Sequence, residues 1–476
     1  MRKTKIICTI GPATDSLEML EKLYDAGMNV VRLNMSHGDH ASHANVIKAI
    51  RTLNKKVAHP IPILLDTQGP EIRTGNLQTD LNLKDGDVIS IVARGAANVE
   101  ETSIPINYDD LIQDVNIGDR ITVDNGLINL EVLSKEELNM RCRVIDGGVL
   151  KSKRHVNLPG IRVNLPAITE KDKQDIAFAV EQEVDFIALS FVREANDIRQ
   201  LRELLGDKAS KIKVVAKIED QEGVRNIEDI ISEADGVMVA RGDLGVEVHA
   251  QDLPNIQRKI VRLCNEMGKR VIVATHLLES MIENPMPTRA EVTDVANAVY
   301  EGADAIMLSG ETTVGKYPIK CVEYLNDISC TSERNPGLQF SKNLIMDNDK
   351  QHIAAAAAHL ADSLDARGIV VITRRGLMAN YLTNCRPHAP VLAFTNDGRT
   401  RRQLSMNHNL LNFKINFSSD AEKTLATAFN MLIARDDFDE NDKVVVLSDI
   451  LSRAGSDAIQ VRQLGQLASE DGMTTE

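Results

Sequence analysis

The sequence predicts an α/β protein in which a (β/α)8 barrel carries an inserted small β-barrel domain and a C-terminal open α/β domain. Eight short apolar runs support the barrel, because continuous Val, Ile and Leu without polar alternation suit parallel strands buried on both faces. Helical stretches separate most of these runs, as the barrel requires. The runs lie at residues 5–10, 30–34, 62–67, 186–191, 214–219, 236–243, 271–275 and 305–311.

Most of these runs end in side chains that are suited to chemistry. The residues at these ends include Arg32, Asn34, Asp66, Lys217, Glu219, Asp243, Thr275 and Glu311. In barrel enzymes the catalytic residues cluster at the C-terminal ends of the strands. The sequence therefore predicts an enzyme that acts on a small anion.

The barrel rhythm breaks after the third run. Residues 71–166 contain short β-type runs and two hairpin-turn signals, DNG at 124–126 and DGG at 146–148, with almost no helical periodicity. This segment is predicted to be an all-β insertion that acts as a lid over the active site. The barrel then comprises residues 1–70 and 167–345, and its second part opens with a helix that Thr169 caps, with Asp172 as the acidic partner.

Residues 346–476 are predicted to form a third unit, an open α/β domain. Helical stretches at 353–366, 376–384 and 397–407, and a long one from Asp420, alternate with strand-like runs. The strand-like runs lie at 368–373, 390–395, 412–417 and 443–450.

Composition limits the class of protein and its partners. The chain has 476 residues, 43% of them hydrophobic and 26% charged, with a net charge of -14. That charge argues against nucleic acid or an anionic membrane as the main partner, so local basic groups must attract any anionic substrate. Six cysteines without metal-ligand spacing indicate reduced thiols. With no run long enough for a signal peptide or a membrane span, the expected location is the cytoplasm.

The strongest chemical signal comes from Lys217, Glu219 and Asp243. Lys217 and Glu219 are two residues apart on one predicted strand, and Asp243 ends the next, so the three side chains are expected to lie close together. Two neighbouring carboxylates indicate a Mg2+ site, and a fixed lysine beside it suits a transferring phosphoryl group. A structural ion pair between Lys217 and Glu219 is the competing interpretation.

A second cluster follows the second and third strands. Asn34, Ser36, Asp66 and Thr67 combine neutral oxygens with one carboxylate, which favours a monovalent cation over a second Mg2+. A cap or turn role for Asn34 and Ser36 is the alternative. Gly242, directly before Asp243, would let backbone N–H groups approach an anion closely.

Several motifs, in order from Cys8 to Pro318, closely resemble those of pyruvate kinases. They are CTIGPAT, VVRLNMSHG, LLDTQGPEIRTG, KIEDQEG, ARGDLGVE, NPMPTRAEVTDVANAV and SGETTVGKYP. The resemblance implies the same three-domain plan and a homotetramer. It also implies transfer of a phosphoryl group from phosphoenolpyruvate to ADP, giving pyruvate and ATP in the last step of glycolysis.

The resemblance also implies roles for individual residues. Lys217 would stabilise the transferring phosphoryl group, and Thr275 would lie near the carbon that takes a proton. Substrate would contact Arg32, Lys217, Gly242, Asp243 and Thr275. Glu219 and Asp243 would bind Mg2+, and Asn34, Ser36, Asp66 and Thr67 would bind K+, with Glu71 marking K+ dependence. Arg73 and Arg154 would contact the nucleotide.

The sequence departs from the family pattern at several places. Arg154 replaces the usual lysine, His155 a glycine, and His276 a glutamine. The effector loop of the family corresponds here to Thr373, Arg374, Arg375 and Gly376, but Leu377 and Met378 follow where Ser and Thr are usual. These arginines, with Arg386, Arg399, Arg401 and Arg402 nearby, predict a phosphorylated allosteric effector.

Two other functions remain open from the residues alone. A Mg2+-dependent aldolase or lyase acting on pyruvate would also pair Glu and Asp beside a basic group, but it needs neither ADP nor the region of Arg73. A non-catalytic metabolite sensor would keep the scaffold without the full set Lys217, Glu219, Asp243 and Thr275.

Overall fold

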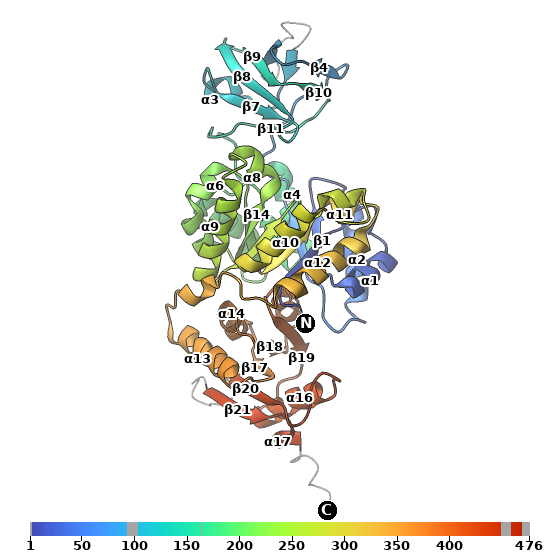
Figure 1. The fold of residues 1–476 in the computed structure, drawn as a ribbon, viewed down its shortest axis with the longest axis vertical. Coiled ribbons are helices and arrows are strands. Elements are labelled where there is room, and N and C mark those ends of the chain that lie inside the picture. The colour runs from blue at the N-terminus through green and yellow to red at the C-terminus, as the bar shows by residue number, and fades with distance from the viewer. Residues whose placement is uncertain (1, 93–102, 162, 449–457, 469–476) are drawn as a thin grey trace, which may run out of the picture.

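A computed structural model describes residues 2–92, 103–161, 163–448 and 458–468. Figure 1 shows three bodies in a row, with the barrel between the β-rich insertion and the C-terminal domain. The barrel is closed by eight parallel strands in the order β1-β16-β15-β14-β13-β12-β3-β2. These strands are β1 (Lys5–Thr9), β2 (Val30–Asn34), β3 (Ile63–Asp66), β12 (Phe186–Leu189), β13 (Lys213–Ile218), β14 (Gly236–Ala240), β15 (Arg270–Ala274) and β16 (Ala305–Leu308). The predicted fold class is confirmed.

Helices follow the strands and cover the outside of the barrel (Figure 1). The longer ones are α1 (Leu17–Ala26), α2 (His40–Leu53), α4 (Glu170–Glu181), α5 (Ala195–Leu205), α7 (Ile227–Glu233), α9 (Leu253–Glu266), α10 (Arg289–Glu301) and α12 (Pro318–Ser332). Short helices stand between strand and main helix at α6 (Gln221–Arg225), α8 (Arg241–Glu247) and α11 (Gly310–Thr313), and 3-10 turns at Gly206–Lys208 and Glu279–Ile282. The predicted cap of α4 is present, with Thr169 and Asp172 in a reciprocal capping box.

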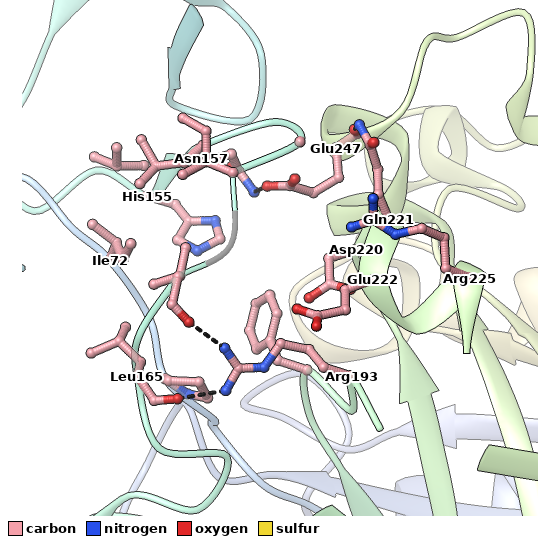
Figure 2. A pocket seen from close by; sticks show the side chains of 17 residues that line it. Ile72, His155, Asn157, Leu165, Arg193, Asp220, Gln221, Glu222, Arg225 and Glu247 are labelled. Carbon is pink, nitrogen blue, oxygen red and sulfur yellow. Dashed lines mark hydrogen bonds between the residues drawn. The ribbon is translucent and has the colours of Figure 1, made fainter. Parts of the chain in front are cut away.

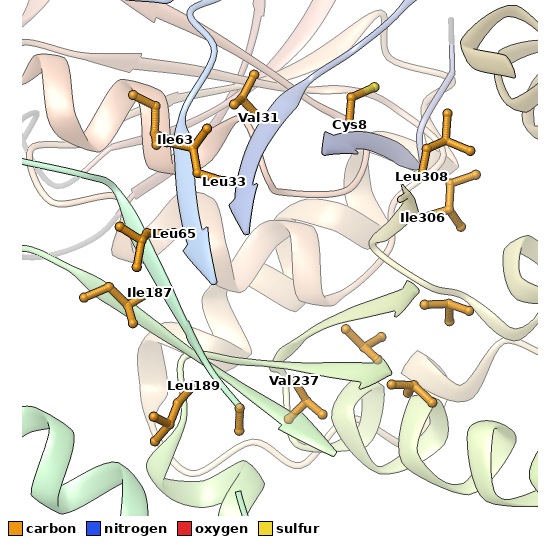
Figure 3. Close-up of a cluster of buried hydrophobic side chains, with 14 of the residues drawn as sticks. Cys8, Val31, Leu33, Ile63, Leu65, Ile187, Leu189, Val237, Ile306 and Leu308 are labelled. Atoms are coloured by element: carbon orange, nitrogen blue, oxygen red, sulfur yellow. The ribbon is translucent and has the colours of Figure 1, made fainter. Parts of the chain in front are cut away.

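Alternate residues of the barrel strands enter two different apolar clusters, because side chains on a strand point to opposite faces. Residues such as Val31, Leu65 and Ile187 face outward and pack against the helices, as Figure 3 shows. Their neighbours fill the interior of the barrel, among them Ile7, Val30, Leu64, Met238 and Met307. The uninterrupted apolar runs of the sequence follow from this double burial.

The insertion contains β4 (Leu81–Leu83), β5 (Val88–Val92), β6 (Ser103–Pro105), α3 (Leu111–Asp114), β7 (Arg120–Val123), β8 (Ile128–Lys135), β9 (Asn139–Asp146), β10 (Gly148–Leu150) and β11 (Val156–Asn157). The predicted small β-barrel is, over the described residues, a six-stranded sheet in the order β11-β7-β8-β9-β5-β6 with a separate β10-β4 pair. The DNG turn joins the antiparallel pair β7 and β8 as predicted. The DGG prediction is wrong: β10 pairs with β4, so this turn carries the chain from one sheet to the other.

The C-terminal domain has one five-stranded sheet in the order β19-β18-β17-β20-β21. A 3-10 turn at Phe340–Asn343 lies against α9 before this domain begins. The elements of the domain are α13 (Asp349–Ser363), β17 (Gly368–Ile372), α14 (Leu377–Asn384), β18 (Val391–Thr395), α15 (Gly398–Leu404), β19 (Leu410–Lys414), α16 (Ala421–Ile433), β20 (Lys443–Ser448), β21 (Ala458–Gln463) and α17 (Gly465–Ala468). The sequence missed β21, which runs antiparallel to β20 at the sheet edge. Residues 449–450, the end of the predicted last strand, lie outside the described residues.

Four residues that were predicted to end strands lie beyond them, and one of these, Thr275, follows the last residue of β15. Strand β14 ends at Ala240, so Asp243 lies on α8 rather than on a strand. Glu219 follows the last residue of β13, and Glu311 lies in α11. Side chains of these short helices contact neighbouring loops: Arg241 of α8 donates to the carbonyl of Thr275, and Glu311 of α11 accepts the N–H of Leu278. Within the described part of the chain, no helix has the length and apolar character needed to cross a membrane.

Candidate active site

A cleft of about 270 Å3 opens between the C-terminal ends of the barrel strands and the insertion. The barrel contributes Arg32, Asn34, Ser36, Lys217 and Asp243, and the insertion contributes Arg73 and Arg154. The cleft therefore brings together residues from all of the predicted substrate, cation and nucleotide sets. It is also lined by His37, Glu71, Asp124, Asn125, Lys153, His155 and Phe191.

Lys217 lies at the base of the cleft between two carboxylates. Its Nζ is 3.0 Å from Asp66 Oδ1 and 3.0 Å from Glu219 Oε1, and it donates to Ser190 Oγ at 2.6 Å. Arg32 Nε donates to the other oxygen of Asp66 at 2.6 Å. Burial alone would lower the pKa of Lys217, but the carboxylates of Asp66 and Glu219 outweigh burial and raise it. Lys217 is therefore a permanently charged group held in one position.

Glu219 is buried, and the negative charge of Asp243 acts on its carboxyl group. It is 2% exposed, and its carboxylate accepts the backbone N–H of Phe191 at 2.6 Å. Burial raises the pKa of Glu219 to about 7, against the opposing effect of Lys217, and the negative charge of Asp243 adds to the rise. A divalent cation between the two carboxylates would remove this repulsion.

The two carboxylates fit a Mg2+ ion. Both are hard oxygen donors, which Mg2+ prefers. Across the residues that the structure describes, no group of three or more His, Cys, Asp and Glu side chains is arranged to hold a metal. Glu219 and Asp243 alone would leave coordination positions free for water and substrate oxygens, as is usual for Mg2+ in phosphoryl-transfer sites.

Gly242 and Thr275 meet at the rim of the barrel. The backbone N–H of Gly242 donates to Thr275 Oγ1 at 2.7 Å. Arg241 supports this contact, because its Nη2 donates to the carbonyl of Thr275 at 2.6 Å and its Nη1 binds Asp294 at 2.7 Å. Thr275 and His276 have φ angles of 68° and 55°, a left-handed conformation that is uncommon for residues other than glycine. The turn after β15 is thus held in a strained conformation from outside.

The four residues of the predicted K+ site lie close together, although part of their hydrogen-bonding capacity is used. Asn34 Oδ1 accepts the N–H of Ser36 at 3.2 Å, which is the turn role that the sequence left open. Thr67 Oγ1 accepts the N–H of Ser190 at 3.0 Å. Burial alone would raise the pKa of Asp66, but Lys217 and Arg32 lower it, so this carboxylate stays charged. The atoms that these four side chains offer to a cation are all oxygens, and this chemistry fits K+.

The side of the cleft formed by the insertion is basic. Arg73 Nε donates to Glu71 at 2.7 Å, and Gln68 Nε2 donates to the same carboxylate at 2.9 Å. Burial alone would raise the pKa of Glu71, yet these hydrogen bonds lower it. Arg154 lies 3.5 Å from Asp124, and its buried Nε has no hydrogen-bond partner among the described residues. Two guanidinium groups therefore border the cleft.

The predicted effector residues lie far from this cleft, in the C-terminal domain. Thr373 Oγ1 accepts the N–H of Gly376 at 3.0 Å at the start of α14, and Arg374 and Arg375 are exposed. The four other arginines bind the barrel: Arg386 with Asp304, Arg399 with Glu183, Arg401 with the carbonyl of Ala58, and Arg402 with Asp185. These four arginines therefore belong to the interface between the two domains. Of the basic residues that suggested an effector site, Arg374 and Arg375 are the two that stay exposed.

Sequence reasoning missed three residues of the site. Ser190 joins Lys217 to the carbonyl of Thr67, Phe191 binds Glu219 through its N–H, and Arg241 holds the Thr275 turn. Ser190 and Phe191 close the apolar run 186–191, so their position at a strand end was the available signal. Arg241 belongs to the ARGDLGVE motif, but its partners Thr275 and Asp294 are distant in sequence, so the motif did not reveal its role.

The chain is similar in sequence to known proteins of one family. Residues 1–322 match the family model "Pyruvate kinase, barrel domain", and residues 351–461 match "Pyruvate kinase, alpha/beta domain". The chain is 43% identical to "Pyruvate kinase isozyme G, chloroplastic" of Nicotiana tabacum over 471 residues, covering 97% of this chain and 84% of that protein. It is 46% identical to a pyruvate kinase of Geobacillus stearothermophilus over 416 residues, covering 85% of this chain and 70% of that protein. The chain belongs to the pyruvate kinase family and is an enzyme of the transferase class.

Proposed function

We propose that this protein transfers the phosphoryl group of phosphoenolpyruvate to ADP, with a requirement for Mg2+ and K+. The observation that carries the proposal is the fixed cation of Lys217, held between Asp66 and Glu219 at the base of a cleft whose other wall is basic. Phosphoryl transfer needs little covalent chemistry from a protein. It relies on positioning the two substrates and on neutralising the charge that develops between them.

The residues of the barrel bind and orient phosphoenolpyruvate in this proposal. Lys217 and Arg32 attract its phosphate, and Lys217 stabilises the oxygens of the group in transfer. The rim formed by Gly242, Asp243 and Thr275 contacts the rest of the substrate, and the Thr275 hydroxyl lies where the enolate takes its proton. Arg73 and Arg154 bind the phosphates of ADP from the insertion, which acts as a lid and excludes water.

Glu219 and Asp243 would hold Mg2+, which supplies charge neutralisation for the phosphate oxygens when bound. Asn34, Ser36, Asp66 and Thr67 would hold K+, and the charged Glu71 beside Arg73 accompanies the K+ requirement. Without a cation, the paired carboxylates of Glu219 and Asp243 would repel an anionic substrate.

Other properties of the molecule belong to the same proposal. The segments 1–70 and 167–345 form the catalytic unit, 71–166 the lid and 346–476 a regulatory domain. The exposed Arg374 and Arg375, with Thr373 and Gly376, would contact a phosphorylated effector. We propose a homotetramer in the cytoplasm, and the six free cysteines are consistent with reducing surroundings.

The decisive experiment measures pyruvate and ATP formed from phosphoenolpyruvate, ADP and Mg2+, with K+ and with a large organic cation in its place. We expect turnover that depends on ADP and rises with K+. Turnover that depends on ADP but not on K+ would reject the K+ site alone. Absence of ADP-dependent turnover, even with sugar phosphates added, would favour the lyase or sensor function.

A further inference from the structure

The chain returns from the insertion to the barrel through a short segment that lies against α8. We call residues 155–158 the return segment. Its strand β11 pairs with β7, so it moves as part of the insertion sheet. Helix α8 belongs to the barrel and carries Gly242 and Asp243 at its start. Figure 2 shows Asn157 of this segment and Glu247 of α8 pointing toward each other beside a cavity of about 70 Å3.

Side chains of the return segment contact both ends of α8, and the backbone of Leu158 also bonds Glu247. Asn157 Nδ2 donates to Glu247 Oε1 at 3.0 Å, and His155 Nδ1 lies 3.5 Å from Asp243 Oδ1. Residues two apart on an extended segment point to the same side, and residues four apart on a helix share a face. The spacing of both pairs therefore lets one face of the return segment lie along one face of α8.

Both residues of the Asn157–Glu247 contact are held in place by the residues around them. Asn157 is 4% exposed, and its Oδ1 has no hydrogen-bond partner among the described residues, so its polar side chain is buried with one hydrogen bond, the one to Glu247. Gln221 Nε2 donates to the carbonyl of Glu247 at 2.6 Å and fixes the end of α8. Burial raises the pKa of Glu247 to about 7, which shows how far its carboxyl is removed from water.

We propose that Asn157 and Glu247 are positioning residues, a latch that sets the insertion at a fixed distance from α8 and thereby determines the affinity for ADP. This inference rests on the proposed function. Lys217 and Glu219 belong to the barrel and keep their places without the latch, whereas Arg73 and Arg154 move with the insertion. Loss of the latch should therefore weaken nucleotide binding much more than it slows the chemical step.

The test is a steady-state comparison of the full-length protein with Asn157→Ala, Glu247→Ala and the double variant. Each single variant should raise the KM for ADP about tenfold, the change expected for loss of one hydrogen bond to a carboxylate, with kcat altered less than about threefold. The double variant should be no worse than Glu247→Ala alone, because Glu247→Ala already removes the bond to Asn157 together with the backbone hydrogen bond from Leu158. Glu247→Gln should recover most of the affinity, since its carbonyl oxygen can still accept from Asn157.

Asn139→Ala is the matched control, because Asn139 donates to Glu136 at 2.9 Å within the insertion and touches no barrel residue through that bond. It should leave the KM for ADP unchanged. An unchanged KM in both alanine variants, or effects that multiply in the double variant, would overturn the latch. A lower melting temperature without a change in KM would also overturn it, since that is a purely structural role. Absence of ADP-dependent turnover in the unmodified protein would instead reject the proposed function.

Discussion

The environment of Lys217 illustrates why single residues carry the chemistry. A buried ammonium group is costly unless carboxylates surround it, and here Asp66 and Glu219 do so at 3.0 Å each. The same arrangement leaves a fixed positive charge at the base of the cleft. An ion pair that served stability alone would not need to border a cavity lined by further arginines.

Replacing Lys217 by methionine should therefore abolish most of the activity. We expect Lys217→Met to lower turnover at least about a hundredfold, because removing one electrostatic partner commonly costs roughly 3 kcal/mol in the transition state. Circular dichroism and thermal unfolding in Mg2+ check that the variant folds. Near-normal turnover in a folded variant would contradict the role of Lys217.

Lys5 is a buried lysine with no role in the cleft. Its Nζ donates to the carbonyl of Leu410 at 2.9 Å, and burial, helped by the charge of Arg2, lowers its pKa from 10.5 to about 7. Between these pH values the unfolded chain binds more protons than the folded one, so stability rises with pH through this window. Below about pH 7 Lys5 is protonated in both states, and the full cost of burying its charge lowers the free energy of unfolding.

Lys5→Met should remove this pH dependence. Between pH 9.5 and pH 7.5 the unmodified protein should lose about 2 kcal/mol more of its unfolding free energy than the variant does. The variant therefore gains in relative stability as the pH falls. Thermal midpoints of both proteins across that range provide the measurement. Curves that stay parallel with pH would mean that Lys5 is not desolvated in the folded state.

At the scale of elements, loops and caps place the site. Lys217 lies on a strand, but Glu219, Asp243 and Thr275 lie on the turns and short helix that follow the strands. Helix α4 shows how a cap also fixes a neighbouring loop. Asp172 accepts hydrogen bonds from Thr169 at the cap and from the backbone N–H groups of Gln68 and Gly69, where the chain leaves the barrel for the insertion.

The two members of this cap should differ in energetic importance. Thr169→Ala should lower the free energy of unfolding by about 1 kcal/mol, the usual cost of an N-cap. Asp172→Ala should cost roughly 2–3 kcal/mol, because it leaves several N–H groups unsatisfied. Gln351→Ala, at the same position in the exposed capping box of α13, is the control and should cost less than about 1 kcal/mol. Equal losses for Asp172 and Gln351, measured in denaturant, would disprove the second role of Asp172.

At the scale of the whole molecule, the C-terminal domain closes the end of the barrel opposite the cleft. Met406 joins the apolar cluster inside the barrel. Arg402 Nε lies 2.9 Å from Asp185, which is 1% exposed at the start of β12. Arg270 reaches the other way and donates to Asn384 and Asn407 of the C-terminal domain. The two domains are thus joined by buried polar contacts.

Breaking one of these contacts should destabilise the molecule as a whole. Arg402→Met leaves the buried Asp185 carboxylate without its cation, which costs about 3 kcal/mol by analogy with other buried pairs. Arg199→Met removes an exposed pair with Glu233 and should cost less than about 1 kcal/mol. Calorimetric melting of both variants checks the difference. Similar small shifts would show that Asp185 is stabilised by other groups.

The sequence by itself determined the barrel, its insertion and the final α/β domain. Strands that are buried on both faces require continuous apolar runs, and tight turns favour Gly and Asp, so both are visible in the sequence. It also supplied the metal and phosphate candidates, since strand ends are visible as the last residues of those runs. Only the tertiary structure placed Asp243 on a helix, paired β21 with β20 and assigned Arg386, Arg399, Arg401 and Arg402 to the barrel interface. Each of these features depends on contacts between residues that are distant in the chain. The local pattern of apolar and polar residues does not reveal such contacts.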